Sequence, residues 1–453
     1  MDGCILKKRQ APFWLRAIQV FLVLASIPLR YLWRELTAPH PPDRDEKLKW
    51  WGEILANTLE RLGAAFVKLG QIASTRPDLL PLPIIKALER LQDRVAPLPF
   101  ERIKPLLQAA WGARYDEIGV EPVPIASASV AQVHKGKLPS GGGIAIKVQR
   151  PEARFQIERD LELMRWMARL LDLVPTLKWM SIPGAVAGFG QALLGQLDFR
   201  KEAQNLRLFA KNFRKERGIR FPKVFDDLSS ETVLVMEYIE GVKATSVEGL
   251  WAGLCPSESA KKRALLAERG CRAVAKMIFE DAFVHADLHP GNILLCEGET
   301  MAFLDCGMVA EIPPEMLRPW TDVFLAMAQG DGPWAAELFY VHAPLAEVED
   351  YERYEREISE KIGLLYRARL GDVEISQVIG GLMDVLRRHR VQIDPVFTNV
   401  NVALLVAEGL GKQLDPEIDL LRVVAPYLLA ARLAAPPGRK PRRASLRKGG
   451  LVG

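Results

Sequence analysis

The segment His285-Ala-Asp-Leu-His-Pro-Gly-Asn292, followed thirteen residues later by Asp305-Cys-Gly307, constrains this chain more than any other feature. Phosphoryl transfer requires a carboxylate near the attacking hydroxyl and oxygen ligands that hold Mg²⁺ on the nucleotide phosphates. Asp287 can supply the carboxylate, whereas Asn292 and Asp305 can supply the metal ligands. The spacing therefore indicates a catalytic and metal-binding segment of the kinase type.

Two apolar runs, Ile293–Leu295 and Ala302–Leu304, lie between the proposed metal ligands and predict two short buried strands. We expect them to form one hairpin with Asn292 and Asp305 at its opposite ends, from which both side chains reach the same metal site. A His-x-Asp-x-x-x-x-Asn pattern alone is common by chance, but the same pattern followed by a hairpin and Asp-x-Gly is not. The prediction is an α+β, two-lobed protein-kinase-like fold.

Length and composition set broad limits. A chain of 453 residues corresponds to two to four structural units, and 49% hydrophobic residues support a substantial core. The five cysteines lack Cys-x-x-Cys spacing, which favours reduced thiols in the cytoplasm and disfavours a structural zinc site.

The net charge of +5 is unevenly spread, because six basic residues and no acidic ones lie between Arg439 and Lys448. This tail is either a solvated segment or a contact for an anionic membrane surface. Nucleic acid is not expected as a partner, because no aromatic platform or recognition helix accompanies the charge.

Two stretches of the chain are apolar enough to be candidates for membrane segments. Ala17–Leu29 is shorter than the roughly 20 residues of a spanning helix, and Arg16 and Arg30 flank it. We expect this stretch to lie on a membrane or to pack on the protein. Trp179–Leu197 has no charged residue but is diluted by proline, glycine and glutamine. No transmembrane helix is predicted.

Periodicity suggests helices over residues 46–95 and 100–119, a β-hairpin at 129–148, a helical stretch at about 151–215, and strands at 221–225 and 232–238. After Cys255 we expect only helices apart from the catalytic hairpin. The expected units are a membrane-associated apolar or amphipathic segment (1–45), a helical extension with a Lys-x-Gly-Gln motif (46–124), a small kinase-like lobe with a helical insertion (125–242), a helical lobe with the catalytic and metal-binding loops (243–435) and a basic tail (436–453).

Lys147, in the strand pattern Ala-Ile-Lys-Val, is expected to reach nucleotide phosphates. Such a lysine needs an acidic partner, for which Glu202 is our candidate. The helix carrying Glu202 must then pack on the strand carrying Lys147. A membrane crossing by Trp179–Leu197 would separate the two residues, so it is disfavoured.

The segment Leu234–Gly241 is expected to join the two lobes and to hydrogen-bond adenine through its backbone, with Met236 at the back of the adenine pocket beside Glu237 and Tyr238. The glycine-rich loop of protein kinases is absent. Alanine and serine stand there instead, and their backbone N–H groups could still bind phosphate although side chains crowd the approach: Ala126, Ser127, Ala128 and Ser129. No Ala-Pro-Glu or long activation segment follows Asp305, so a peptide-substrate platform is not expected.

Together these residues resemble the UbiB/AarF family of atypical kinases, which act in isoprenoid quinone metabolism, over residues 50–430. The most specific mark is Phe66-Val-Lys-Leu-Gly-Gln71, with Arg76–Pro81 and Leu91–Asp93 downstream. The resemblance implies that Lys68 and Gln71 fold over the active site, occupy the place of a protein substrate and touch the nucleotide site. It also implies the roles of the core residues: Asp287 in the catalytic loop, Asn292 and Asp305 as Mg²⁺ ligands, and Lys147 with Glu202 as the ion pair.

Two departures from the family pattern stand out. Gln196 replaces the glutamate of a Glu-x-Asp motif, although Asp198 is retained, and a glutamine cannot contribute charge to a metal or to Lys68. Bacterial members often carry two C-terminal membrane-spanning helices, whereas this chain ends in the basic tail. We therefore expect a cytoplasmic protein, peripheral to the inner membrane through the tail, the N-terminal stretch or the surface around Trp179–Leu197.

Three functions follow as hypotheses. The first is a UbiB-type kinase or ATPase that binds ATP or ADP with Mg²⁺ and supports prenylquinone or lipid metabolism, such as ubiquinone biosynthesis. The second is a small-molecule phosphotransferase of the aminoglycoside or choline kinase sort, which shares the catalytic-loop pattern but lacks the Lys68–Gln71 segment. The third is a pseudokinase that acts as a scaffold or lipid-binding protein. The phosphoryl acceptor and the oligomeric state stay open.

Overall fold

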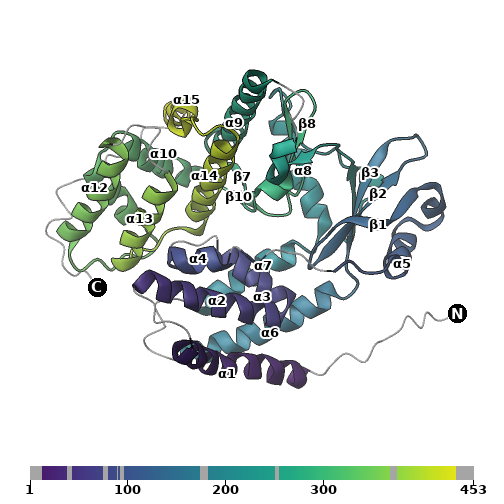
Figure 1. Cartoon of the computed structure of the whole chain (residues 1–453), viewed down its shortest axis with the longest axis horizontal. Coiled ribbons are helices and arrows are strands. Elements are labelled where there is room, and N and C mark those ends of the chain that lie inside the picture. Colours follow the sequence, from purple (N-terminus) through teal and green to yellow (C-terminus); the bar gives the residue numbers. More distant parts are fainter. Residues whose placement is uncertain are drawn as a thin grey trace.

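The computed structural model describes residues 13–37, 43–74, 80–88, 90–91, 96–173, 182–249, 255–367 and 375–434. Figure 1 shows three parts: a layer of N-terminal helices, a small lobe around a β-sheet, and a larger helical lobe. The fold is therefore a mixed α+β, kinase-like fold preceded by N-terminal helices, as predicted.

The N-terminal layer holds four helices: α1 (Phe13–Thr37), α2 (Arg44–Leu62), α3 (Ala64–Ser74) and α4 (Leu82–Leu88). The Asp43 side chain accepts a hydrogen bond from the backbone N–H of Glu46 and so caps α2. Gly63, with φ of 98°, then turns the chain into α3. The four helices lie beneath both lobes in Figure 1, where α3 packs on α2 and α6.

α1 is longer than the sequence suggested. Among the described residues, Trp14–Thr37 is the one helix long and apolar enough, by length and composition, to cross a membrane. Pro28 and Arg30 lie inside it instead of ending it. Length and composition of α1 therefore do not exclude spanning, and its contacts must decide how it lies.

The small lobe is built on an antiparallel sheet in the order β1-β2-β3-β5. Its strands are β1 (Gly119–Ser127), β2 (Ala131–Lys137), β3 (Gly143–Gln149) and β5 (Val233–Glu237). The predicted hairpin is β2–β3. β1 was not predicted, because Pro122 and Pro124 suggested a break. An edge strand tolerates proline, and register shifts flank Pro124 in the pairing with β2.

Helix α5 (Phe100–Trp111) and the 3₁₀ turn η1 (Gly112–Glu117) cover one face of this sheet. Ile103 and Leu107 are fully buried there against inward-facing valines and isoleucines of β3 and β5. The predicted strand at 221–225 is largely wrong, since only Val224 forms a bridge, to Met236; a short turn, η3 (Asp226–Leu228), follows.

The expected helical stretch at 151–215 is three helices: α6 (Ala153–Asp172), α7 (Ile182–Gly195) and α8 (Phe199–Asn212). α7 packs on α6, and Phe189, Leu193 and Leu197 are buried in a core shared with α2 and α3. Part of the uncharged stretch 179–197 thus faces this core and is not free for a membrane. Residues 179–181 lie outside the described residues.

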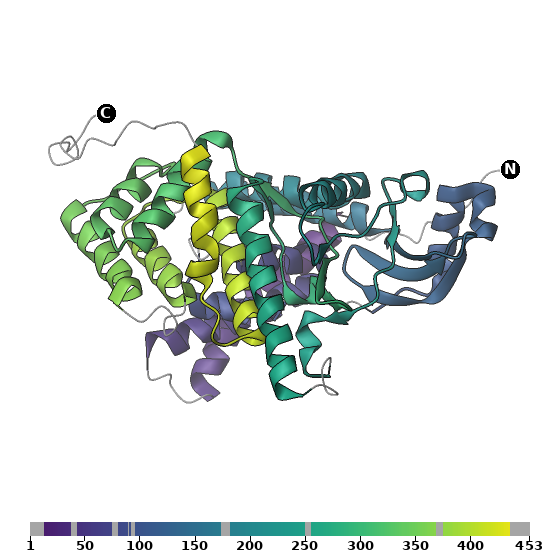
Figure 2. The ribbon, with the colours of Figure 1, turned by 90° about the horizontal axis from the view of Figure 1, so that it is seen from above.

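The large lobe is mostly helical: α9 (Pro256–Phe279), α10 (Pro314–Ala328), α11 (Gly332–Val341), α12 (Tyr351–Arg367), α13 (Ile375–Arg388), α14 (Pro395–Leu414) and α15 (Leu420–Ala434). α9, α14 and α15 pack side by side, as Figure 2 shows. Helices α9 and α14 also contact the short strand β7 (Phe283–His285), which leads into the candidate catalytic loop.

Two small sheets complete this lobe, where only one hairpin was predicted. The first joins β4 (Ile219–Arg220), β9 (Thr300–Phe303), β8 (Ile293–Cys296) and β6 (Val242–Lys243), and turns η4 (Ala244–Gly249) and η5 (Pro290–Asn292) lie nearby. The second pairs β7 (Phe283–His285) with β10 (Val309–Glu311). Because β7 runs directly into residues 286–292, the second sheet fixes the start of the catalytic loop.

Candidate active site

The two proposed metal ligands lie at the same, open end of the β8–β9 hairpin. Ile293 pairs with Phe303, and the backbone N–H of Leu304 donates to the carbonyl of Asn292 at 3.0 Å. The expectation of opposite ends is therefore wrong, because an antiparallel hairpin brings the residue before its first strand next to the residue after its second. This arrangement places Asn292 and Asp305 side by side.

Lys147 joins the two lobes through carboxylates on both sides. Its Nζ lies 2.7 and 2.8 Å from the two carboxylate oxygens of Glu202 and 3.2 Å from Oδ2 of Asp305. Glu202 on α8 is buried, with 3% of its surface exposed, whereas 44% of the Asp305 side chain is exposed. Lys147 therefore binds a buried carboxylate behind it and a solvent-reaching carboxylate in front.

Lys147 and Asp305 stabilise each other's charged forms, whereas burial raises the pKa of Glu202 to about 7. Burial alone would raise the pKa of Asp305, but the Lys147 ammonium and a hydrogen bond from the Gly307 N–H outweigh burial and hold that pKa well below its usual value. Burial would likewise lower the pKa of Lys147, but the carboxylates of Asp305 and Glu202 raise it. Both groups are ionised at neutral pH, as a lysine that binds phosphate and a carboxylate that binds metal must be.

The backbone after Asp305 is held against α8. Gly307 N–H donates to Oδ1 of Asp305 at 3.0 Å, and Nδ2 of Asn205 donates to the carbonyl of Cys306 at 2.9 Å. A Cβ on Gly307 would lie 3.1 Å from Oδ1 of Asp305 and 3.5 Å from Oε2 of Glu202. The first distance is tight, so a larger residue here would push the Asp305 carboxylate by a few tenths of an ångström; Gly307 and Asn205 therefore help to set the position of Asp305.

His285 connects the catalytic loop to the metal-binding loop. One ring nitrogen, Nε2, contacts the carbonyl of Asp305, and the backbone N–H of Asp287 donates to the other, Nδ1, at 3.3 Å. Burial lowers the pKa of His285, so the ring is neutral. A neutral imidazole with Nε2 protonated satisfies both contacts, and it ties the backbones of Asp287 and Asp305 together.

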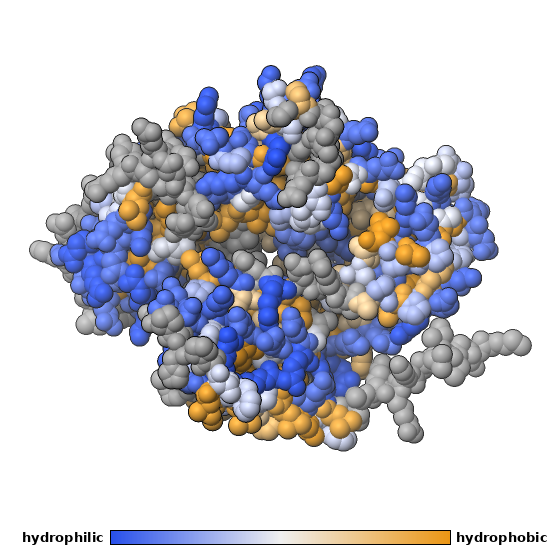
Figure 3. Space-filling model, viewed as in Figure 1, coloured by the Kyte–Doolittle hydropathy of each residue, from blue (hydrophilic) through white to orange (hydrophobic). Residues whose placement is uncertain are grey.

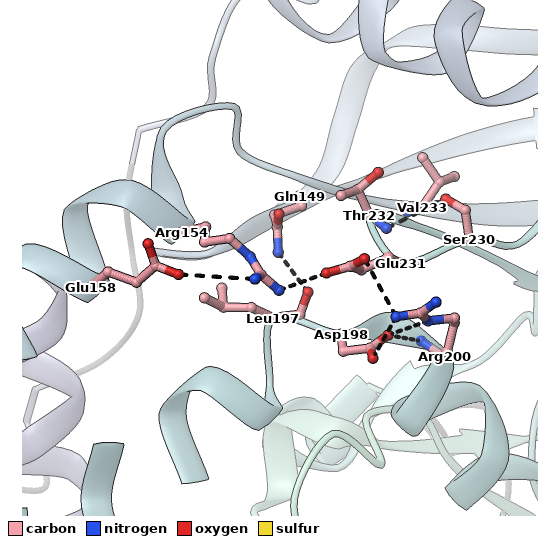
Figure 4. A network of polar contacts seen from close by, with 10 residues as sticks. All are labelled: Gln149, Arg154, Glu158, Leu197, Asp198, Arg200, Ser230, Glu231, Thr232 and Val233. Atoms are coloured by element: carbon pink, nitrogen blue, oxygen red, sulfur yellow. Dashed lines mark hydrogen bonds and ion pairs between the residues drawn. The ribbon is translucent and has the colours of Figure 1, made fainter. Parts of the chain in front are cut away.

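Figure 4 shows how the start of α8, and hence Glu202, is held on the small lobe. The buried Gln149 of β3 donates to the carbonyl of Leu197 at 2.8 Å. Near it, Glu231 accepts hydrogen bonds from Arg154 at 2.6 Å and from Arg200 at 3.4 Å.

Asp198, the aspartate retained from the family pattern, caps the start of α8 and pairs with Arg200 at 2.8 Å. The Asp198 carboxylate therefore points toward Arg200.

Lys68 reaches the catalytic loop from α3. Its Nζ lies 3.6 Å from Oδ2 of Asp287, with 11% of the Lys68 side chain and 41% of the Asp287 side chain exposed. Gln71, one turn later, donates instead to the carbonyl of Leu91 at 2.7 Å. Gln71 thus holds α3 against the segment after α4, while Lys68 alone of the two is seen to contact the candidate site. Arg76, Gln92 and Asp93 lie outside the described residues.

The residues predicted to line the phosphate loop have different surroundings. Ala126 and Ser127 belong to β1, opposite Val133 and Gln132, and the Ser127 hydroxyl accepts from Arg150 at 2.8 Å. The Ala128 N–H donates to the Ala131 carbonyl at 2.8 Å. The Ser129 hydroxyl is buried and has no hydrogen-bond partner. The Ser127 hydroxyl can still donate a hydrogen bond, whereas the Ser129 hydroxyl is enclosed.

Strand β5 and Tyr238, which lead to the larger lobe, already use some of their backbone N–H groups in hydrogen bonds within the protein. Met236 is buried in β5 opposite Ala145 of β3. The N–H groups of Glu237 and Tyr238 donate to the carbonyls of Lys223 and Gly143, at 2.8 and 3.1 Å. These two N–H groups are therefore not free for adenine, and any backbone contact to a ring must use carbonyls or residues nearer Gly241.

Gln196, the departure from the family pattern, follows α7. Its side-chain Nε2 is buried without a hydrogen-bond partner. An unsatisfied buried amide is costly and calls for a partner that a ligand or a movement could supply.

The site fits a magnesium nucleotide by its donor set. In the part of the chain that the structure describes, no group of three or more His, Cys, Asp or Glu side chains could hold a metal. Mg²⁺ in nucleotide sites needs only one or two carboxylates, with phosphates and water completing the shell. Asp305 and Asn292 suit that role, and Lys147 suits the phosphates.

Four residues position the site in ways that the sequence did not predict: Gln149, Asn205, His285 and Gly307. The pattern Asp-x-Gly was the available signal for Gly307. Gln149 and Asn205 act through backbone carbonyls, for which a single sequence offers no signal.

Two family models match the chain: the ABC1 atypical kinase-like domain over residues 90–338 and the UbiB helical domain over residues 358–419. The "Probable protein kinase UbiB" of Vibrio atlanticus is 35% identical over 390 residues, which cover 83% of this chain and 70% of that protein. The protein of the same name from Erwinia tasmaniensis is 34% identical over 421 residues, covering 89% and 74%.

A solved structure also resembles the chain. The complex of Rv3197 with erythromycin from Mycobacterium tuberculosis has a TM-score of 0.50 and 23% sequence identity, covering 83% of this chain and 99% of that one. At this identity the likeness supports the fold alone.

Proposed function

The chain belongs to the UbiB family of ABC1 atypical kinase-like proteins, and from this premise we propose that it is an atypical kinase or ATPase that binds Mg-ATP or Mg-ADP between its lobes. The observation that carries the proposal is the ion-paired cluster in which Lys147 lies between buried Glu202 and exposed Asp305. Nucleotide phosphates need a cationic side chain of this kind, and a divalent cation needs a carboxylate that reaches solvent beside it.

In this proposal Lys147 binds nucleotide phosphates, Asn292 and Asp305 would hold magnesium, and Asp287 orients the attacking hydroxyl or water. A bound magnesium ion would neutralise charge on the phosphates. The residue groups would divide as predicted: 46–124 over the site, 125–242 and 243–435 as the two lobes, and 1–45 and 436–453 toward a membrane.

In the structure, the ion pair with Lys68 closes the candidate site at Asp287. A lysine that neutralises Asp287 competes with the reacting group for that carboxylate. Turnover then requires Lys68 to release Asp287, and a peptide substrate would meet α3 at this position. We therefore propose a small molecule or water, and not a protein, as the acceptor. We also propose that the activity supports isoprenoid quinone or lipid metabolism, such as ubiquinone biosynthesis, on the cytoplasmic side of a membrane.

The test is Mg²⁺-dependent ATP hydrolysis by the purified protein, with and without a prenylquinone in detergent. Asp287→Asn should lose activity by about two orders of magnitude or more, while Asp227→Asn, in an exposed ion pair with Arg114, should keep it. If the wild-type protein binds nucleotide but does not hydrolyse it, the proposed enzymatic activity is contradicted and the pseudokinase hypothesis is favoured.

A further inference from the structure

Helix α1 (Phe13–Thr37) has its apolar side facing outward and its charged residues facing the protein. All four of its charged residues, Arg16, Arg30, Arg34 and Glu35, are half-buried. The outward positions, which recur every three to four residues, are exposed and apolar: Trp14, Leu15, Ile18, Phe21, Leu22, Leu29, Leu32, Trp33 and Leu36. Figure 3 shows this surface as an apolar band along the lower edge of the molecule.

The inward contacts hold α1 flat on the body of the protein. Arg16 donates to both oxygens of Asp160 on α6, at 2.8 and 2.9 Å, and Arg34 donates to Glu53 on α2 at 2.6 Å. Tyr31 stacks on a ring of α2, that of Trp51, with 4.5 Å between centroids. Two helices therefore anchor α1 near both of its ends, through charge and through ring stacking.

These contacts decide between spanning and lying flat. A helix inserted across a bilayer would carry Arg30 into hydrocarbon, and Arg16 and Arg34 would lose Asp160 and Glu53 as partners. A spanning helix is apolar on all sides, whereas α1 is charged on one side only. It is not a core helix either, because only 11% of its most apolar 18-residue window is buried.

We propose that the outward face of α1 inserts into the boundary between headgroups and acyl chains of an anionic bilayer, with the helix axis parallel to the membrane surface. A continuous exposed apolar face of this kind marks an interaction surface. Trp14 and Trp33 lie near its two ends, and tryptophan prefers the membrane interface.

Charge identifies the partner as a lipid surface. Lys7, Lys8 and Arg9 immediately precede α1 in the sequence, and Asp2 is the only acidic residue among the first twelve. Basic residues next to an interfacial helix are attracted to anionic headgroups. This inference deepens the proposed function and rests on its membrane role, because it identifies the surface that would meet the membrane.

The experiment is flotation of the full chain with vesicles made of equal parts phosphatidylcholine and phosphatidylglycerol. Phe21→Ser, Leu29→Ser and Trp33→Ser together should reduce the floated fraction about tenfold or more. The control is Val123→Ser, Leu265→Ser and Leu364→Ser, which removes three exposed apolar side chains from other surfaces, and it should float like the wild type. Thermal melting should show both variants folded.

Flotation of the outer-face variant at the wild-type level would overturn the proposal. So would a wild-type protein that does not float but forms a dimer that the outer-face variant loses, since a second copy would then cover this face. Retention of the protein in membranes at alkaline carbonate pH would contradict the flat orientation. Nucleotide binding, measured without vesicles, tests the proposed function separately from this surface.

Discussion

The ammonium of Lys68, on α3 of the N-terminal layer, lies 3.6 Å from the carboxylate of Asp287 in the catalytic loop. The two residues are 219 positions apart in the sequence, and they come together because α3 packs beneath both lobes. The carboxylate expected to orient the nucleophile is thus neutralised by a helix outside the kinase-like core.

Removing this lysine should change ligand handling more than stability. Lys68→Ala removes the ion pair with Asp287, whose carboxylate is 41% exposed, and a pair with a solvent-exposed partner contributes about 1 kcal/mol or less. We expect a nearly unchanged melting temperature and an altered ratio of ATP to ADP affinity, measured by titration calorimetry. The same ratio as in the parent would show that Lys68 does not act on the nucleotide site.

Gly307→Ala should disturb the metal-binding loop. The new Cβ would lie 3.1 Å from Oδ1 of Asp305 and crowd that carboxylate. We expect nucleotide affinity in Mg²⁺ to fall by about tenfold, equivalent to about 1.4 kcal/mol. Gly363→Ala is the control, because its helical Cβ would meet no atom within 4 Å and should leave affinity unchanged. Equal affinities in both variants would refute this account of Gly307.

The network at the start of α8 should be stabilised mainly by its buried member. Gln149→Leu leaves the buried carbonyl of Leu197 without its donor, which costs about 1–3 kcal/mol. Glu231→Gln weakens exposed ion pairs with Arg154 and Arg200 and should cost under about 1 kcal/mol. Urea denaturation measures both. A larger loss in Glu231→Gln would reverse this ranking.

Acid should destabilise the protein partly through Asp305. Lys147 and Gly307, against the effect of burial, hold the folded-state pKa of Asp305 below its usual value. The unfolded chain protonates this carboxyl below about pH 4, so its contribution to stability is complete above that pH and is lost as pH falls through the folded pKa. Between about pH 5 and pH 3, the free energy of unfolding should therefore fall more in the wild type than in Asp305→Asn. Parallel curves would contradict this.

The elements and contacts that the sequence predicted correctly have clear local sequence patterns. The turn glycines and β-branched residues indicated β2–β3, and a strand lysine followed by a helical glutamate led to Lys147 and Glu202. The small second sheet, β7 with β10, was missed because each strand has only three residues. Strands this short carry too little periodicity to distinguish them from loop.

The remaining errors concern long-range packing and edge effects. β1 was missed because two prolines exclude a central strand but not an edge strand. Arg30 bounds the apolar stretch 17–29 in the sequence, whereas in the structure it lies inside α1 and donates to the hydroxyl of Thr58 on α2 at 3.4 Å. Which group Lys68 meets depends on how the N-terminal layer docks, and no local pattern contains that information.

The measurement that tests the central claim most directly is thermal melting with Mg-ATP and with Mg-ADP, for the wild type and for Asp305→Asn. A nucleotide at one hundred times its dissociation constant should stabilise the wild type by about 2.7 kcal/mol. We expect a Mg²⁺-dependent rise in the melting temperature that Asp305→Asn loses. The same rise in the variant would contradict the metal-binding role of Asp305, and no rise in the wild type with either nucleotide would contradict the nucleotide site itself.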